Sequence, residues 1–151
     1  YQKATPRPEC TELPDCDLSL VIIDSGTAGN TAQMVQNVRD DYEQNKVFLK
    51  KMGACTIQIR DEISKPEINL PELGALFSEN QGLLQEIGVS TPTIDRIIEH
   101  AVKLGALGAK LSGSGGGGIV MCLSLNPKNL IEEMIQFGYK AFSIHPFNSE
   151  E

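Results

Sequence analysis

The chain opens on a stretch without hydrophobic periodicity, and short apolar runs and longer helical stripes follow it. Residues 1–17 carry Pro6, Pro8 and Pro14 and are predicted to be an irregular lead-in. Residues 18–23 form an almost continuous apolar run, bounded by Asp17 and by the segment 24–26. Such a run predicts a buried strand.

Two helices are expected after the loop at 25–29. Asn30 and Thr31 are good N-caps, and apolar residues at helical spacing predict about three turns after them: Met34, Val35, Val38 and Tyr42. The segment 46–63 fits two patterns, because residues 55–59 also alternate like a strand. The longer pattern favours a helix, with Phe48, Met52, Cys55, Ile59 and Ile63 on one face.

The remaining elements follow from prolines, glycines and apolar stripes. Pro66 and Pro71 interrupt the pattern and begin a helix that Gly88 ends, with a stripe of Leu73, Leu76, Phe77, Leu83 and Leu84. Ser90 or Thr91 caps the next helix, which Gly105 ends and whose apolar face is Ile94, Ile97, Ile98, Ala101 and Leu104. A strand, a glycine loop and a second strand come next, then a helix that begins at Pro127 and ends before Gly138, and a final strand at 140–145.

This order of elements, β-α-α-α-α-β-β-α-β, predicts an α+β domain. One adjacent β-β pair and strands that return around helices favour a mainly antiparallel sheet covered on one side by helices. We expect residues 18–147 to form one domain, with 148–151 as a tail.

Composition narrows the class of protein. The 151 residues are 40% hydrophobic and 22% charged, with 13 basic and 20 acidic residues and a net charge of -7. An acidic chain without a basic cluster argues against nucleic acid or anionic membranes as partners. No apolar run reaches the roughly 18 residues of a membrane span, and no signal peptide opens the chain. We therefore expect a cytoplasmic protein, and the start at Tyr1 suggests a piece of a longer product.

The cysteines do not predict a metal site. Cys10, Cys16, Cys55 and Cys122 form no C-x-x-C pair and lie far from both histidines, so no metal ligand is assigned. Cys122 sits in an apolar run and is interpreted as a small buried hydrophobe. A Cys10–Cys16 disulfide is the alternative to the reduced thiols that we expect.

A cluster of glycines is the most unusual feature. Five of the 14 glycines lie between Gly113 and Gly118. Because glycine costs backbone entropy, turn formation alone does not explain the run. Backbone N–H groups without side chains can approach an anion closely, and Lys110, Ser112 and Ser114 flank them. The alternative is a flexible hairpin connection that binds nothing.

Three known glycine patterns fail here on context. A Walker A loop needs a lysine after its last glycine, and none follows Gly118. A dinucleotide-binding turn leads into a helix, whereas residues 119–123 are expected to be a strand. A protein kinase loop would be accompanied by H-R-D and D-F-G motifs, which the chain lacks.

The segment Gly108–Gly118 resembles the third signature of the GHMP kinases, the superfamily of galactokinase, homoserine, mevalonate and phosphomevalonate kinases. Three flanking phrases are similar to its mevalonate kinase branch: Gly88-Val89-Ser90 with Gly105–Leu111, Asp24-Ser25-Gly26 with Asn30-Thr31, and Asn80–Leu84. Ser25 stands where threonine is more common. The resemblance covers about residues 18–145 and implies a ferredoxin-like four-stranded sheet.

The resemblance covers only the C-terminal half of such an enzyme. No P-x-x-x-G-L-G-S-S-A-like phosphate-binding signature occurs, so the catalytic residues are expected in an N-terminal half, and none is assigned in this chain. The resemblance implies ATP and Mg²⁺ as cofactors, bound mainly by that half. It implies nucleotide binding by Gly113, Ser114, Gly115, Gly116 and Gly117, and substrate binding by Ser25, Gly26 and Ser114.

The resemblance implies phosphorylation of the 5-hydroxyl of mevalonate, in isoprenoid precursor biosynthesis. The expected partners are the small-molecule substrate and the N-terminal domain of the same protein, and a homodimer stays open. Two alternatives remain: a sibling kinase acting on phosphomevalonate, homoserine or a sugar, and a non-catalytic domain that binds a small effector.

Four polar residues are given structural roles. Asp24 is expected to cap the turn that follows it, Lys110 to be a solvated strand charge, and His100 and His145 to lie in solvent.

Overall fold

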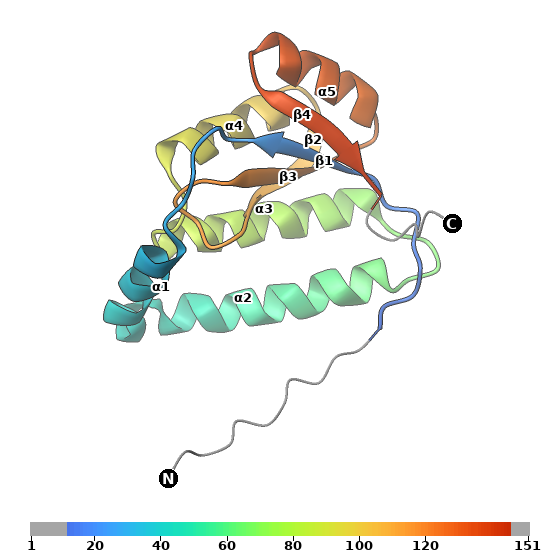
Figure 1. Ribbon diagram of the computed structural model, residues 1–151. Coiled ribbons are helices and arrows are strands. Elements are labelled where there is room, and N and C mark those ends of the chain that lie inside the picture. Colours follow the sequence, from blue (N-terminus) through green and yellow to red (C-terminus); the bar gives the residue numbers. More distant parts are fainter. Residues whose placement is uncertain (1–11, 146–151) are drawn as a thin grey trace.

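The computed structural model describes residues 12–145 and has four strands around which five helices pack (Figure 1). The strands are β1 (Leu20–Asp24), β2 (Ala106–Ser112), β3 (Ile119–Ser124) and β4 (Lys140–Ile144). The helices are α1 (Thr31–Asp40), α2 (Tyr42–Ile63), α3 (Leu70–Glu86), α4 (Pro92–Lys103) and α5 (Pro127–Gln136). The predicted order of elements is confirmed. The domain limits at 147 and 151 lie outside the described residues.

The strands form one antiparallel sheet in the order β2-β3-β1-β4. β1 pairs with β3 through Ile23↔Val120 and with β4 through Ile22↔Phe142, and β2 pairs with β3 through Leu111↔Val120. This is the strand order of a split β-α-β, or ferredoxin-like, sheet, with α1 to α4 all inserted before β2. The predicted α+β class and antiparallel sheet are confirmed.

Helices cover both faces of the sheet, so the prediction of one covered side is wrong. Figure 1 shows α4 and α5 on one face and α3 on the other, with α2 stacked outside α3. The reason lies in β1, where consecutive residues from Leu20 to Ile23 are all buried. Because neighbouring side chains on a strand point to opposite faces, a continuous apolar strand needs cover on both.

Each face has its own hydrophobic core. On the α4–α5 face, Val21 and Ile23 pack among buried residues that include Ile94, Ile97 and Met134. On the α3 face, Ile22 packs with buried residues that include Leu20, Leu73, Phe77 and Leu123. The predicted stripe on α3 is buried throughout: Leu73, Leu76, Phe77, Leu83 and Leu84.

The segment 46–63 is helical, as the longer pattern predicted. It belongs to α2, which starts four residues earlier at Tyr42, so placing Tyr42 on the preceding helix is wrong. Asp41 separates the two helices. Between the two predicted caps, Thr91 is the one that caps α4, because its side chain accepts a hydrogen bond from Ile94 N.

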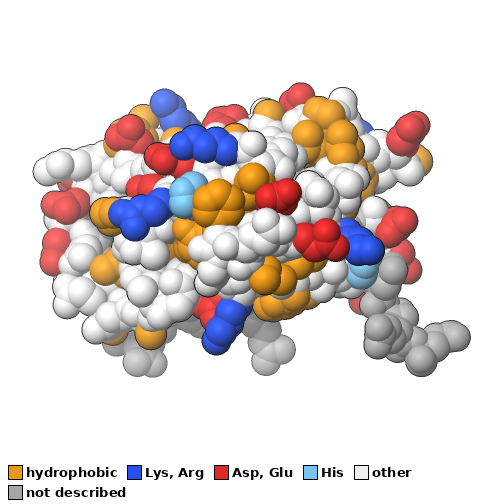
Figure 2. All heavy atoms as spheres, turned by 90° about the horizontal axis from the view of Figure 1, so that it is seen from above, with side chains coloured by type: hydrophobic (Ala, Val, Ile, Leu, Met, Phe, Trp, Pro, Cys, Tyr) orange, Lys and Arg blue, Asp and Glu red, His pale blue; other side chains and the backbone are white. Residues whose placement is uncertain are grey.

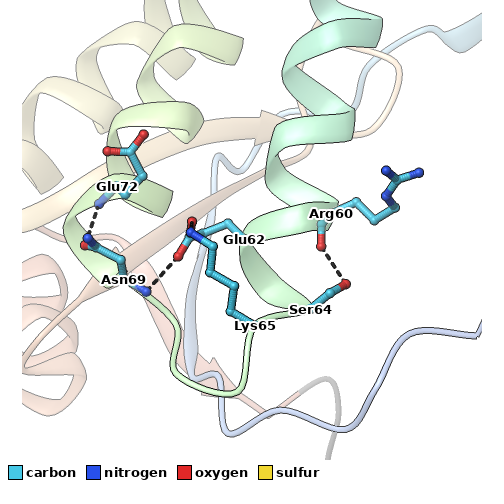
Figure 3. A network of polar contacts seen from close by, with 6 residues as sticks. All are labelled: Arg60, Glu62, Ser64, Lys65, Asn69 and Glu72. Carbon is cyan, nitrogen blue, oxygen red and sulfur yellow. Dashed lines mark hydrogen bonds and ion pairs between the residues drawn. The ribbon is translucent and has the colours of Figure 1, made fainter.

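A polar network closes the turn between α2 and α3 (Figure 3). The buried carboxylate of Glu62 accepts a hydrogen bond from Asn69 N at 2.8 Å and forms an ion pair with Lys65. Asn69 in turn caps α3, since its Oδ1 accepts from Glu72 N at 3.1 Å. The Lys65 ammonium, followed by the Asn69 N–H, lowers the pKa of Glu62 below its usual range.

The outer surface over α4 and α5 mixes acidic and basic side chains with small groups of hydrophobic ones (Figure 2). Val102 on α4, Ile135 on α5 and Phe137 just after α5 contribute exposed apolar side chains. Within residues 12–145, no helix is long and apolar enough to cross a membrane.

Candidate functional site

The glycine loop at 113–118 meets the loop after β1 at one end of the sheet, beside α1 (Figure 1). Ser25 N donates to Gly118 O at 3.0 Å, and Gly118 N donates to Thr27 O at 2.8 Å. These two bonds extend the β1–β3 pairing beyond Asp24↔Ile119. The two loops that the sequence picked out independently are therefore in direct contact.

The turn between α3 and α4 holds the other half of the glycine loop. Gly116 N donates to Val89 O at 2.9 Å, and the Ser114 and Thr31 hydroxyl oxygens lie 2.8 Å apart. The glycine loop is thus fixed to three segments: the loop after β1, the start of α1 and the α3–α4 turn.

Close contacts explain why these positions are glycine. A Cβ on Gly115 would lie 2.5 Å from Val89 O, and one on Gly117 would lie 2.5 Å from Thr27 O. A Cβ on Gly29, across the gap, would lie 2.2 Å from Gly115 O. All five glycines of the loop also have positive φ, which other residues rarely adopt. The run therefore serves close backbone packing as well as any ligand.

Four amides in the loop remain available for a ligand. Within residues 12–145, the N–H groups of Gly113, Ser114, Gly115 and Gly117 donate to no protein acceptor. Successive backbone amides in a turn, such as those of residues 113–115, can form a concave site that suits an anion such as a phosphate. Gly116, which was predicted to bind nucleotide with these four residues, uses its amide to hold the loop on Val89.

The segment Asp24-Ser25-Gly26 forms a tight turn at the end of β1. Asp24 Oδ1 accepts from Gly26 N at 2.9 Å, so Asp24 caps the turn as predicted. The Ser25 hydroxyl lies 3.0 Å from Thr27 Oγ1, and Gly26 has φ +67°. Ser25 and Gly26 therefore lie next to Gly118, on the side of the glycine loop that faces β1.

A groove of about 370 Å³ runs along the other side of the glycine loop. Gly113 and Ser114 form one wall, and α1, α2 and the α3–α4 turn supply apolar side chains that include Met34, Tyr42 and Val89. A larger cavity of about 670 Å³ opens at the opposite end of the sheet, near Ser124 and His145, and contains none of the predicted site residues.

The other polar residues singled out from the sequence form none of the hydrogen bonds that hold residues 113–118. Lys110 is half-buried instead of solvated: its Nζ donates to Leu111 O at 2.7 Å, and burial lowers its pKa. His100 is also half-buried, with Nδ1 3.0 Å from Tyr139 Oη and its ring against Phe137, so its assignment to solvent is wrong. His145 is exposed as predicted.

Cys122 is fully buried as predicted, and burial raises its pKa to about 12. The Cys10–Cys16 alternative involves Cys10, which lies outside the described residues. In the part of the chain that the structure covers, no cluster of His, Cys, Asp or Glu could hold a metal ion.

Sequence reasoning missed the residues that hold the loop by backbone or hydroxyl groups. Val89 and Thr27 act through carbonyl oxygens, Thr31 through its hydroxyl and Gly29 by having no side chain. Backbone carbonyls carry no side-chain signature. Gly29 gave a weak signal, as a second glycine in a loop next to a strand end, and Val89 and Thr31 stood out as members of phrases that resemble the family.

Comparisons with known proteins identify the family to which this domain is similar. The family model described as GHMP kinases C terminal matches residues 61–141. A mevalonate kinase of Thermococcus sibiricus is 35% identical over 131 residues, 82% of this chain and 38% of that protein. One from Saccharolobus solfataricus is 36% identical over 116 residues, 74% of this chain and 35% of that protein.

Among solved structures, L. major mevalonate kinase in complex with R-mevalonate superposes with a TM-score of 0.74 at 27% identity. The match covers 87% of this chain and 44% of that one. The chain belongs to the GHMP kinase family and has the fold of its C-terminal domain. It spans 35 to 38% of the length of the two curated mevalonate kinases named above.

Proposed function

We propose that this chain is the C-terminal domain of an ATP-dependent mevalonate kinase. In this proposal, the whole protein transfers the γ-phosphoryl group of ATP to the 5-hydroxyl of mevalonate. The hydroxyl oxygen bonds to the γ-phosphorus, the bond from that phosphorus to the β–γ bridging oxygen breaks, and ADP leaves. The four unpartnered amides in the loop against Ser25–Thr27 are the observation that supports it best.

Each predicted site residue has a proposed role within this domain. The Gly113, Ser114, Gly115 and Gly117 amides would face phosphate oxygens, where fixed N–H dipoles stabilise negative charge. Gly116 supports the loop through Val89. Ser25 and Gly26 would line the substrate side, and the Ser114 hydroxyl would donate to substrate or phosphate once it turns from Thr31.

The residues present fit phosphate better than they fit a metal ion. The amides and the Ser114 hydroxyl are donors, whereas Mg²⁺ prefers oxygen ligands, and the Asp24 carboxylate already accepts from Gly26 N. We therefore assign Mg²⁺, most of the nucleotide pocket and the proton acceptor for the hydroxyl to the N-terminal domain of the same protein. We place the enzyme in the cytoplasm.

ADP release tests this proposal. The full-length protein that contains this segment is assayed with Mg²⁺-ATP and, separately, mevalonate, phosphomevalonate, homoserine and galactose, with the 151-residue chain as control. We expect turnover with mevalonate alone and none by the short chain. Turnover with another acceptor would keep the class of kinase but change its substrate.

A different outcome would replace the proposal. If no acceptor yields ADP while the 151-residue chain binds a small metabolite in calorimetry, the chain is an effector-binding domain. Weak turnover by the short chain with any acceptor would contradict the assignment of the catalytic residues to another domain.

A further inference from the structure

Gln81, near the end of α3, is a buried polar side chain that the site described above does not use. Only 4% of its surface is exposed, yet all the polar atoms of its amide have partners. Nε2 donates to Ser90 Oγ at 2.9 Å and to Asp95 Oδ1 at 3.3 Å, and Oε1 accepts from Leu111 N at 2.8 Å. One side chain therefore joins α3, the α3–α4 turn, α4 and β2.

Two of its hydrogen-bond partners, Leu111 and Ser90, are close in sequence to the glycine loop or to one of its attachment points. Leu111 lies two residues before Gly113, where the chain leaves β2. Ser90 follows Val89, whose carbonyl oxygen holds Gly116 N. The Gln81 amide thus links the strand from which the loop departs to the turn to which the loop is attached.

Gln81 binds β2 at the edge of the sheet, where the backbone of β2 has no neighbouring strand on one side. β2 is an edge strand, and the N–H of Leu111 points away from β3 to reach Gln81. The carbonyl of the same residue accepts from Lys110 Nζ at 2.7 Å. Side chains therefore take the place of a neighbouring strand at Leu111, one residue before the end of β2.

The far end of the network is anchored as well. Asp95 Oδ1 also accepts from Ser90 Oγ at 2.7 Å and from Gln85 Nε2 at 2.9 Å. Asp95 lies in the first turn of α4, where a carboxylate is stabilised by the helix dipole. This carboxylate holds the Ser90 and Gln81 side chains in one orientation.

We propose that Gln81 is a positioning residue for phosphoryl transfer. It holds the glycine loop in register with the loop after β1. The inference rests on the proposed kinase function. Gln81 does not touch the loop's free amides, so it acts through Leu111 and Ser90. Small displacements of a phosphate-binding loop reduce the chemical step more than they reduce ground-state binding.

The variant Gln81→Met tests the proposal, because methionine has a similar length and no amide. Gln85→Met is the matched control, since it removes a hydrogen bond to the same Asp95 oxygen without affecting Leu111. Amide exchange is followed by NMR in the 151-residue chain, and kcat and KM are measured in the full-length protein.

In Gln81→Met we expect the Leu111 and Gly116 amides to exchange at least about tenfold faster. The amides of β1 should keep their wild-type rates. We expect kcat to fall about 10- to 100-fold with KM for ATP changed less than about threefold. Gln85→Met should change these values much less, because Gln85 is exposed and Asp95 Oδ1 keeps its hydrogen bonds from Gln81 and Ser90.

Unchanged exchange at Leu111 and Gly116 would overturn the proposal, and so would faster exchange with unchanged kcat. If wild-type protein phosphorylates no acceptor, the proposed function fails by itself, and the exchange measurements still decide whether Gln81 holds the loop.

If Gln81→Met does not fold, a second pair of variants decides. Gln81→Glu keeps an oxygen for Leu111 N but faces Asp95 with a second carboxylate. Adding Asp95→Asn restores an N–H donor between the two positions. We expect the double variant to recover kcat relative to Gln81→Glu alone, with Asp95→Asn alone as control. A double variant no faster than Gln81→Glu would overturn the proposal.

Discussion

Individual glycines in the loop differ in what a methyl group would do to them. Gly113 has φ +107° and open space around its missing Cβ. Gly115 has φ +94°, and a Cβ added there would lie only 2.5 Å from Val89 O. Backbone strain affects both positions, but only the second adds a steric clash with a backbone atom. These two positions therefore separate conformational strain from packing.

We expect Gly115→Ala to lower the free energy of unfolding by about 2–4 kcal/mol and Gly113→Ala by about 1–2 kcal/mol. Gly53, in the middle of α2 with nothing near its missing Cβ, is the control. Gly53→Ala should raise stability by about 0.5–1 kcal/mol, because alanine favours a helix. Urea unfolding of the three variants measures these values. Equal losses at 113 and 115 would contradict the steric argument.

Cys122 illustrates the effect of burial on a single thiol. Its pKa of about 12 means that almost no thiolate, the reactive form, exists at neutral pH. We expect iodoacetamide at pH 8 to leave Cys122 unmodified in the folded chain and to alkylate it in urea, as read by mass spectrometry of the peptides. Labelling of Cys122 in the folded chain at the rate seen in urea would refute this.

Side-chain patterns predicted the residues whose role is to be buried or to be small. The α3 stripe, Cys122 and the glycine run all carry such a signal in their residue types. His100 was misplaced because its partner Tyr139 is 39 residues away, beyond any local pattern. Long-range pairing of this kind needs the fold.

At the scale of the elements, the contacts of Glu62 that close the α2–α3 turn depend on pH. The pKa of Glu62 is lower in the folded chain than in the unfolded chain, so its charged form stabilises the fold. That stabilisation is complete above the unfolded value, near 4.5, and is lost as the pH falls through the folded value. The turn should therefore loosen in acid and not in base.

We expect the Asn69 amide, which donates to Glu62, to exchange faster relative to the other amides as the pH falls from 6 to 3, once intrinsic rates are corrected. The variant Glu62→Gln keeps an oxygen acceptor for Asn69 N but carries no charge. It should show a weaker pH dependence over the same range. Identical pH profiles in the two proteins would show that Glu62 does not control the turn.

Helices were predicted well where their apolar residues all lie on one face. The segment 46–63 was recognised as a helix because its apolar residues continue at helical steps beyond the short alternating stretch. Its start at Tyr42 was missed, since Asp41 interrupts two helices without any glycine or proline to mark the break. Cover on both faces of the sheet could have been deduced from the continuous run in β1.

At the scale of the whole molecule, the layers are held at one unusually close contact. A Cβ on Gly108 of β2 would lie 1.9 Å from Gly74 O of α3, so the two backbones touch without side chains between them. This contact sets the distance between the sheet and the helix that carries Gln81. Gly108 opens the glycine signature, but Gly74 belongs to no motif found in the sequence, so the contact between the two could not be predicted.

We expect Gly108→Ala to lower the free energy of unfolding by about 3 kcal/mol, because neither backbone can move away without disturbing a whole layer. Gly82 lies on α3, as Gly74 does, and has open space at its missing Cβ. Gly82→Ala should therefore be neutral or slightly stabilising. Thermal and urea unfolding of both variants measure the difference. A loss at position 108 no larger than that at position 82 would contradict the close contact.

The attachment of the glycine loop on three sides also determines when its disorder is removed. A segment with five glycines has large conformational entropy in the unfolded chain. Bonds to Val89, Thr27 and Ser25 fix it as the domain folds, before any phosphate arrives. The loss of conformational entropy therefore lowers the stability of the domain and does not lower the affinity for a ligand.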